Sequence, residues 1–318
     1  MGTTTFRQRL INAFVFVGTV GVKLIHAFVR KIKLILLYQR REVIEFLADP
    51  QSLPGKRPRV MVAIAHITTP EESANRQFGA QKIERLRHTI DGLLTSLAHC
   101  DVQIVICTVP QRHITRFLPD YQQASLVLHE AIDCDPMYIG FVAQDQLATQ
   151  VTQHDWFVFI EDDIVLSDSF FLEKIEQFNR VYGHDNALLF PNRYEMSQGK
   201  KSYIDLTIDR DLAWDRLSRF AIGNVKFAEC TNPHAGIYCL SQAQMRRWIA
   251  SGRSWKNRPL MVGPLESAAT FCLLECFAIF KPHPTNLNYL EVRHYDTKYS
   301  RLYPGPSPHI LSAVSKLS

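Results

Sequence analysis

Beyond residue 58, apolar and polar positions follow two patterns that alternate along the chain. Four runs of mostly apolar residues are typical of strands buried on both faces, at 59–67, 102–109, 125–129 and 156–160. Residues 80–98 instead carry apolar side chains at helical spacing, and residues 141–152 also have a helical pattern. Buried strands that alternate with helices predict an α/β fold, with a mostly parallel sheet flanked by helices.

The first 48 residues have a different pattern, which is both apolar and basic. Residues 10–29 are nearly all apolar but are interrupted by Lys23 and His26, whereas a membrane crossing needs about 20 apolar residues. Basic side chains flank this segment and are more numerous after it. We therefore expect a helical membrane anchor or interfacial helix, with the following domain on the cytoplasmic side. An amphipathic helix packed on the domain or on a partner chain is the alternative.

The remaining boundaries follow from composition. Residues 49–57 are punctuated by Pro and Gly and predict a linker. We expect one domain over residues 58–303 and a flexible tail over 304–318. With 46% hydrophobic and 21% charged residues, the chain is not of the disordered class.

Charge and cysteine content exclude two further classes. The net charge is +5, but residues 1–60 carry eleven Lys and Arg against three Asp and Glu, and the remainder carries 25 against 28. This distribution does not favour a nucleic-acid-binding surface. The seven cysteines form no C-x-x-C pair, which indicates reduced thiols in the core and neither a zinc site nor a disulfide framework.

Three consecutive acidic residues, Glu161, Asp162 and Asp163, directly follow the apolar run at 156–160. Ligands of open α/β sheets bind beyond the carboxyl ends of the strands. Because side chains alternate along an extended chain, Glu161 and Asp163 should share a face that Asp162 opposes. Converging carboxylates need a cation, and Mg²⁺ or Mn²⁺ prefers oxygen ligands of this kind. The alternative is an acidic surface turn that caps the next helix.

An apolar strand that ends in such a motif resembles the GT-A glycosyltransferases, which transfer sugars from nucleotide-sugar donors. The resemblance covers about residues 58–303 and implies a GT-A-like, Rossmann-like fold. It further implies that Asp163 and His294 hold Mn²⁺ or Mg²⁺, His294 by its position near the end of the domain. Glu161 and Asp162 would contribute to the ion or to the ribose of the donor.

For the rest of the donor site, the resemblance points to two regions. The loop 68–76 after the first strand would hold the nucleotide base and ribose, with Thr68 and Arg76 as candidate contacts. Arg293, Lys298 and Arg301 lie near His294 in the sequence, so they could neutralise a departing diphosphate. Each of these side chains could instead be an ordinary solvated group.

The acceptor side also resembles the family. Residues 232–240, followed by a helix over 241–250, look like its acceptor strand and helix, with Gly236 permitting close approach of a sugar ring. At the next helix start many inverting relatives carry Glu-Asp, with the Asp as base, whereas this chain has Glu266 and Ser267. Glu266 is therefore the candidate base, or it binds the acceptor and caps the helix.

Together these features predict a metal-dependent glycosyltransferase acting on a glycan or lipid-linked acceptor at a membrane surface. A nucleotidyltransferase is the alternative enzyme, although residues 66–72 lack the Gly-rich basic loop that it usually carries. A membrane-tethered binding or scaffold protein on the same fold is the alternative outside the enzymes. The polar segments 192–201 and 210–226 are expected to be loops that form acceptor walls or lids.

Overall fold

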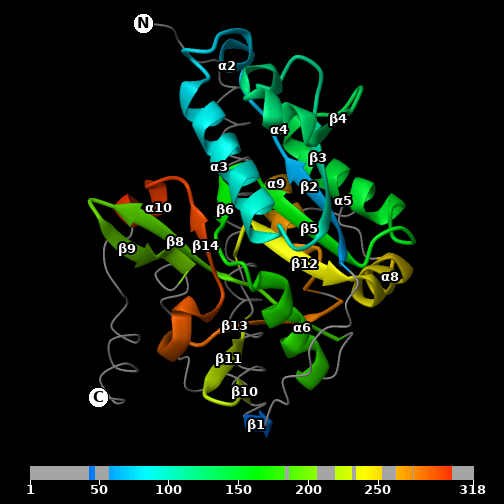
Figure 1. Cartoon of the computed structure of the whole chain (residues 1–318), viewed down its shortest axis with the longest axis vertical. Helices are drawn as coiled ribbons and strands as arrows, with labels where there is room; N and C mark the ends of the chain where they lie inside the picture. The colour runs from blue at the N-terminus through cyan, green and yellow to red at the C-terminus, as the bar shows by residue number, and fades with distance from the viewer. Residues whose placement is uncertain are drawn as a thin grey trace, which may run out of the picture.

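The computed structural model of the chain describes residues 43–46, 57–182, 186–205, 219–230, 234–252, 263–274 and 276–302 (Figure 1). Most of the predicted anchor at 1–48 and of the linker at 49–57, together with the tail at 304–318, lies outside the described residues. None of the helices in the described part combines the length and the apolar character that a membrane crossing requires.

A five-stranded sheet in the order β12-β5-β2-β3-β4 forms the centre of the fold. Four of its strands are parallel, namely β2 (Arg59–Ala65), β3 (Asp101–Thr108), β4 (Leu126–Glu130) and β5 (Trp156–Glu161). Strand β12 (Ile237–Ser241) pairs antiparallel with β5. All four strands predicted from apolar runs are therefore confirmed. β5 has a partner on each side, and its first five residues are buried, in agreement with its apolar sequence.

Helices cover the central sheet from both sides. In Figure 1, α3 (Ala80–Ser96) and α5 (Ile139–Thr149) lie to either side of β2 and β5. α3 turns Leu86, Ile90 and Leu93 into the core, as its helical spacing predicts. The other helices are α2 (Pro70–Ala74), α4 (Asp120–Ala124), α6 (Phe171–Tyr182), α8 (Gln242–Ala250), α9 (Pro264–Glu266) and α10 (Lys298–Leu302). The α/β class and the helix-flanked, mostly parallel sheet are confirmed.

A second sheet has the order β1-β10-β11-β13-β7. Its strands are β1 (Val43–Phe46), β7 (Ala187–Leu189), β10 (Arg219–Ile222), β11 (Val225–Glu229) and β13 (Ala278–Pro282). β1 falls within the segment that we expected to be helical, but it pairs parallel with β10. The prediction is wrong for these four residues; Val, Ile and Phe, three of the four residue types in the segment, favour strands.

The third sheet, in the order β6-β14-β8-β9, carries residues that prove important for the candidate site. Its strands are β6 (Ile164–Leu166), β8 (Asn192–Ser197), β9 (Lys200–Tyr203) and β14 (Glu291–His294). Segment 192–201 is thus part of a β-hairpin and not the loop that we expected. Gln198 and Gly199 form its turn with positive φ angles of 50° and 75°, as tight hairpins require. Residues 219–222 and 225–226 of the second expected loop also belong to strands, and 206–218 lie outside the described residues.

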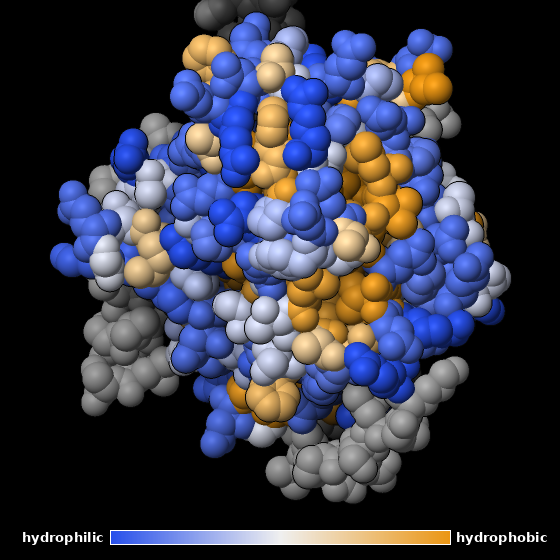
Figure 2. All heavy atoms as spheres, turned by 45° about the horizontal axis from the view of Figure 1, so that its top comes forward, coloured by the Kyte–Doolittle hydropathy of each residue, from blue (hydrophilic) through white to orange (hydrophobic). Residues whose placement is uncertain are grey.

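The cysteines of the chain lie mostly in the core, and its surface is mostly polar. All seven cysteines are free and five are buried, as predicted for core thiols. Charged and polar side chains cover most of the face shown in Figure 2, and apolar side chains form several smaller areas, mainly near its centre. Large apolar side chains that are exposed include Ile132, Met137 and Tyr138, which follow β4 in the sequence.

Helix α8 begins with a capping box that offers a test of its local stability. The backbone N–H of Gln244 donates to Ser241 Oγ at 3.2 Å, and the backbone N–H of Ser241 donates to Gln244 Oε1 at 2.8 Å. Replacing Ser241 by Ala should lower the free energy of unfolding by about 1 kcal/mol, because one N–H at the helix start loses its acceptor. Urea denaturation measures the loss. Ser241→Thr, which keeps the hydroxyl, should retain most of the stability, and equal losses in the two variants would contradict the capping role.

Candidate active site

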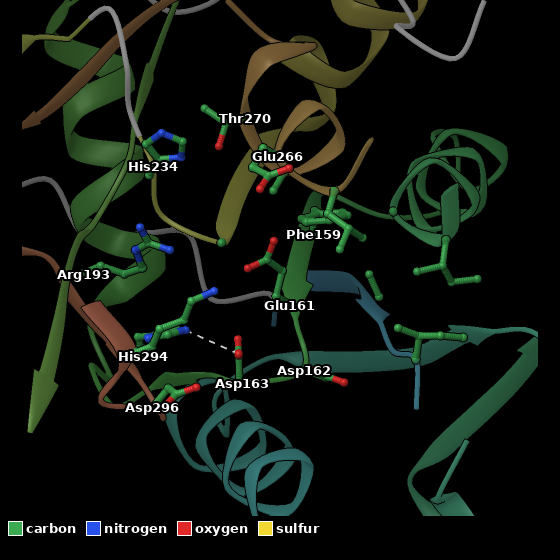
Figure 3. A pocket seen from close by; sticks show the side chains of 18 of the residues that line it. Phe159, Glu161, Asp162, Asp163, Arg193, His234, Glu266, Thr270, His294 and Asp296 are labelled. Carbon is green, nitrogen blue, oxygen red and sulfur yellow. Dashed lines mark ion pairs between the residues drawn. The ribbon is translucent and has the colours of Figure 1, made fainter. Parts of the chain in front are cut away.

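A cavity of about 470 Å³ opens where β2 and β5 end (Figure 3). Seven of the residues named from the sequence line it, namely Glu161, Asp162, Asp163, Gly236, Glu266, His294 and Lys298. They come from the end of β5 and the turn after it, the residue before β12, the short helix α9, the last residue of β14 and the first residue of α10. The fold therefore gathers most of the predicted site residues around one space.

Asp162 points away from its two neighbours, as the alternation of side chains predicts (Figure 3). It is only 5% exposed. Its carboxylate accepts hydrogen bonds from His66 Nδ1 at 2.6 Å and from Lys82 Nζ at 3.0 Å. Burial by itself would raise the pKa of Asp162, but Lys82 and His66 hold it below its ordinary value. Asp162 therefore ties the acidic turn to α3 and to the end of β2.

The pairing of β6 with β14 brings His294 to Asp163. In this antiparallel register His294 lies opposite Ile164, and the backbone N–H of Tyr295 donates to the carbonyl oxygen of Asp163 at 2.7 Å. His294 Nε2 lies 3.4 Å from Asp163 Oδ2, the contact marked in Figure 3. Burial lowers the pKa of His294, but its hydrogen bonds with Asp163 and Glu195 raise it to about 9. In the absence of another cation, the imidazole is therefore protonated at neutral pH.

Glu195, which sequence reasoning missed, holds the other side of His294. Its side chain is fully buried and accepts a hydrogen bond from His294 Nδ1 at 2.8 Å. It also accepts from the backbone N–H groups of Tyr299 at 3.2 Å and Ser300 at 2.7 Å, near the start of α10. One carboxylate on β8 thus fixes both the imidazole and α10. The only sequence signal was two charged residues, Arg193 and Glu195, spaced to share one face of a strand.

Glu161 is enclosed more tightly than its position at a strand end suggests. Its backbone N–H donates to the carbonyl oxygen of Gly236 at 2.8 Å. Gly236 has a φ of +64°, and a Cβ there would lie 2.7 Å from Glu161 Oε2. We expected this glycine to admit a sugar ring, and the group that the structure places against it is the Glu161 carboxylate. Burial, and then the charge of Asp163, raise the pKa of Glu161 to about 7.

Glu266 faces the cavity from the side opposite Glu161 (Figure 3). It is the last residue of α9, and it is exposed, unlike Asp162. A side chain at Gly263, which precedes α9, would collide with the Glu266 carboxylate. The carboxylate therefore lies beside the start of its own helix and also lines the cavity. This geometry suits both roles that we considered for Glu266.

Arg193 on β8 lines the cavity as well and was not predicted. Its Nε donates to Asp205 Oδ1 at 3.1 Å, its Nη2 lies 3.1 Å from the same oxygen, and its backbone N–H donates to Asp205 Oδ2 at 2.9 Å. Lys281 Nζ lies 2.6 Å from the same Oδ2. Burial lowers the pKa of Arg193, but the charges of Asp205 and Glu161 raise it above its ordinary value. The guanidinium is therefore a fixed positive charge at the cavity wall.

Three predicted donor contacts, Thr68, Arg76 and Arg293, do not line this cavity. Thr68 is buried and its Oγ1 has no hydrogen-bond partner in the described part. Arg76 is exposed in the turn between α2 and α3. The Arg293 guanidinium lies over the Tyr295 ring at 4.3 Å. Lys298, in contrast, belongs to the lining.

The donor set at Asp163 and His294 can be tested for its fit to a divalent ion. Within the described residues, no three His, Cys, Asp or Glu side chains are grouped to hold a metal ion by themselves. However, Asp163 Oδ1 is buried without a hydrogen-bond partner in the described part. Glu195 orients His294 as carboxylates orient metal-bound imidazoles. Mg²⁺ commonly takes one or two protein ligands and completes its shell with substrate phosphates. The pair therefore fits an ion shared with a diphosphate.

Comparisons with known proteins place nucleotide enzymes among the similar structures. No family model and no curated protein matches the chain. Glucosyl-3-phosphoglycerate synthase from Mycobacterium tuberculosis, solved with Mn²⁺ and UDP-glucose, is 14% identical over 86% of this chain and 85% of its own, with a TM-score of 0.42. Nucleotide-sugar transferases are thus among its structural neighbours.

Two further neighbours show the range of activities. Galactosyltransferase LgtC, solved with donor and acceptor sugar analogues, is 9% identical over 70% of this chain and 72% of its own, with a TM-score of 0.34. CMP:2-keto-3-deoxy-manno-octonic acid synthetase, solved with CTP, is 11% identical over 83% of this chain and 97% of its own, with a TM-score of 0.36. Similarity at this level does not decide the activity, which must come from the side chains of the site.

Gly236 provides a test of how tightly the site is packed around Glu161. A Gly236→Ala change should lower the free energy of unfolding by about 1–2 kcal/mol for the left-handed backbone, and by a further 1–3 kcal/mol, roughly, for the contact with Glu161. Gly223→Ala is the matched control, because Gly223 has a φ of +58° and no atom lies within 4 Å of the place that its Cβ would take. Urea denaturation compares the two variants. Equal destabilisation would show that no close contact exists at Gly236.

Proposed function

We propose that the chain is a metal-dependent glycosyltransferase that moves a sugar from a nucleoside-diphosphate sugar to an acceptor hydroxyl. The observation that carries this proposal is the convergence of Asp163, His294 and Glu266 on one cavity. An acidic turn, an oriented imidazole and a separate carboxylate are the groups that metal binding and proton removal from a hydroxyl require. The cavity lies beyond the carboxyl ends of β2 and β5, where ligands of α/β sheets bind.

Asp163 and His294 are the residues that would hold Mn²⁺ or Mg²⁺. Such an ion would supply positive charge to the nucleoside diphosphate as it leaves. Lys298 lines the same cavity and adds a second positive charge for the phosphates. Asp162 is held by Lys82 and His66, so it fixes the position of the turn that carries Asp163. For the base and ribose we retain Thr68 and Arg76 as proposed contacts, with Arg293 as a proposed contact to the diphosphate.

Glu266 is the proposed base for the acceptor hydroxyl. The other carboxylates of the cavity have partners or lie deeper in it: Asp162 pairs with Lys82, and Asp296 with Arg85 at 3.0 Å. Among the described residues, no ion pair involves Glu266. Its exposed carboxylate is therefore available to accept a proton or to orient the hydroxyl at the side of the cavity facing Glu161.

A glycan or lipid-linked acceptor at a membrane surface, on the cytoplasmic side, remains our proposal. The apolar and basic sequence of residues 1–48 supports it. The exposed Met137 and Tyr138 also support it, because they belong to the 3₁₀ turn η2 (Pro136–Tyr138), which packs against α9 beside Glu266. An apolar part of an acceptor could therefore lie close to the proposed base.

Nucleotide binding should depend on a divalent ion and on Asp163. The full chain is titrated with UDP, GDP and CMP by calorimetry, in Mn²⁺ or in EDTA. We expect one nucleotide to bind in Mn²⁺, and EDTA or Asp163→Asn to weaken it by at least about 10–100-fold, the loss that even a change in a ligand's outer-shell partner causes. Asp168→Asn is the control, since Asp168 pairs with Lys174 and does not line the cavity. No binding of any nucleotide would overturn the proposed function, and metal-dependent binding without sugar turnover would favour the scaffold alternative.

Removing the Glu266 carboxylate should affect turnover and not nucleotide binding. Glu266→Gln should lower the rate of donor turnover by about 10²–10⁴-fold, because the amide cannot accept the proton. Release of nucleoside diphosphate from the bound nucleotide sugar measures the rate, and calorimetry measures binding. Glu176→Gln on α6 is the matched control, since Glu176 lies outside the cavity. Unchanged turnover in Glu266→Gln would restrict this residue to capping its helix.

A further inference from the structure

A buried cluster of Arg193, Asp205 and Lys281 lies at one wall of the cavity. Their side chains are 7%, 4% and 2% exposed. Among the described residues, both cations form ion pairs with Asp205 only. The cluster therefore holds two positive charges and one negative charge away from solvent.

An excess buried charge is unfavourable unless an anion compensates it. Lys281 is enclosed, since its ammonium also donates to the carbonyl oxygen of His234. Arg193 is the member that lines the cavity. The net positive charge of the cluster therefore reaches the cavity through the Arg193 guanidinium, whose other negatively charged neighbour is Glu161 across the cavity.

The geometry of Arg193 is that of a prepared anion contact. Asp205 accepts from Nε and lies beside Nη2, which leaves Nη1 without a hydrogen-bond partner among the described residues. The Tyr299 ring lies 5.4 Å from the guanidinium carbon and adds a second restraint. A planar guanidinium held in this way loses little freedom when it binds a carboxylate or a phosphate.

Figure 3 shows where such an anion would lie. The Arg193 guanidinium stands between His294 and His234, across the cavity from Glu161. His234, Thr270 and Glu266 continue the lining on the side away from Asp163. An anion on Arg193 would thus lie between the proposed metal ligands and the proposed base.

We propose that the Arg193–Asp205–Lys281 cluster binds a carboxylate or phosphate group of the acceptor, so that the acceptor is an anionic molecule. This inference rests on the proposed function, because it assigns the donor diphosphate to Asp163, His294 and Lys298. With its anionic group on Arg193, an acceptor would present a neighbouring hydroxyl towards Glu266. The donor diphosphate is the other oxyanion that can reach Arg193, so the experiment must distinguish the two.

The test uses the full chain saturated with Mn²⁺ and the nucleotide identified by titration. Glycerol 3-phosphate, glycerate and glycerol are then added in separate calorimetric titrations, as two anionic probes and a neutral one of similar size. We expect at least one anionic probe to bind and glycerol not to bind. Arg193→Met should weaken anion binding by about tenfold or more, because a charged hydrogen-bond donor is lost, while the affinity for the nucleotide stays unchanged.

Two further variants keep the test decisive. Arg193→Met leaves Lys281 and Asp205 as a one-to-one pair, and thermal unfolding checks that the variant folds. If it does not fold, Arg193→Lys keeps the charge without the planar fork and should bind the anion with reduced affinity. Arg59→Met is the matched control, because Arg59 also pairs with an aspartate, Asp155 at 3.2 Å, at the other end of β2.

Three results would overturn the inference. Binding of glycerol as well as the anions, or no binding of either anion, would mean that the site does not select a charged acceptor. An equal loss of nucleotide and anion binding in Arg193→Met would assign the guanidinium to the donor diphosphate. Failure of the unmodified chain to bind any nucleotide would be seen before an anion is added, and would overturn the proposed function itself.

Discussion

Three carboxylates that follow a buried strand must each be neutralised separately, and much of the architecture around the cavity serves this requirement. β5 lies between β12 and β2 in the interior of its sheet, and the three carboxylates line the cavity at its end. The alternation of side chains sends Asp162 to Lys82 and His66, and Asp163 to His294. Glu161 has no such partner among the described residues, and burial with the charge of Asp163 raises its pKa to about 7. The placement of α3 and β14 is therefore an electrostatic necessity as much as a matter of packing.

β14 pairs with β6 on one side and with β8 on the other, and this pairing fixes the position of His294. Glu195 orients the His294 imidazole from one side, and Asp163 contacts it from the other. A shift of β14 by one residue would turn His294 to the opposite face of its sheet. The position of His294 in the site thus depends on the register of β14. Backbone hydrogen bonds to two neighbouring strands fix this position more firmly than a loop would.

The sequence predicted the parts of this arrangement that are encoded locally. Apolar runs located β2, β3, β4 and β5 to within two residues at their ends, because a strand buried on both faces leaves a continuous apolar pattern. It did not predict the hairpin of β8 and β9, whose polar residues suggested a loop. Arg193 and Glu195 are buried there through partners that lie 12 and 99 residues away. In a local sequence pattern, polar residues that are buried by distant ion pairs look the same as solvated ones. For this reason the sequence did not reveal Arg193 and Glu195 as residues of the site.

β8 carries one residue for each of the two proposed binding sites, the acceptor site and the metal site. Arg193 and Glu195 are two residues apart on one strand, so they share a face and move together. One carries the positive charge proposed to meet the acceptor, and the other orients the imidazole proposed to meet the metal. The fixed spacing of the two residues along the strand would hold the proposed anion and the proposed ion at a set separation. Donor and acceptor would therefore be positioned by a single strand, which would align the two substrates without requiring a loop to close over them.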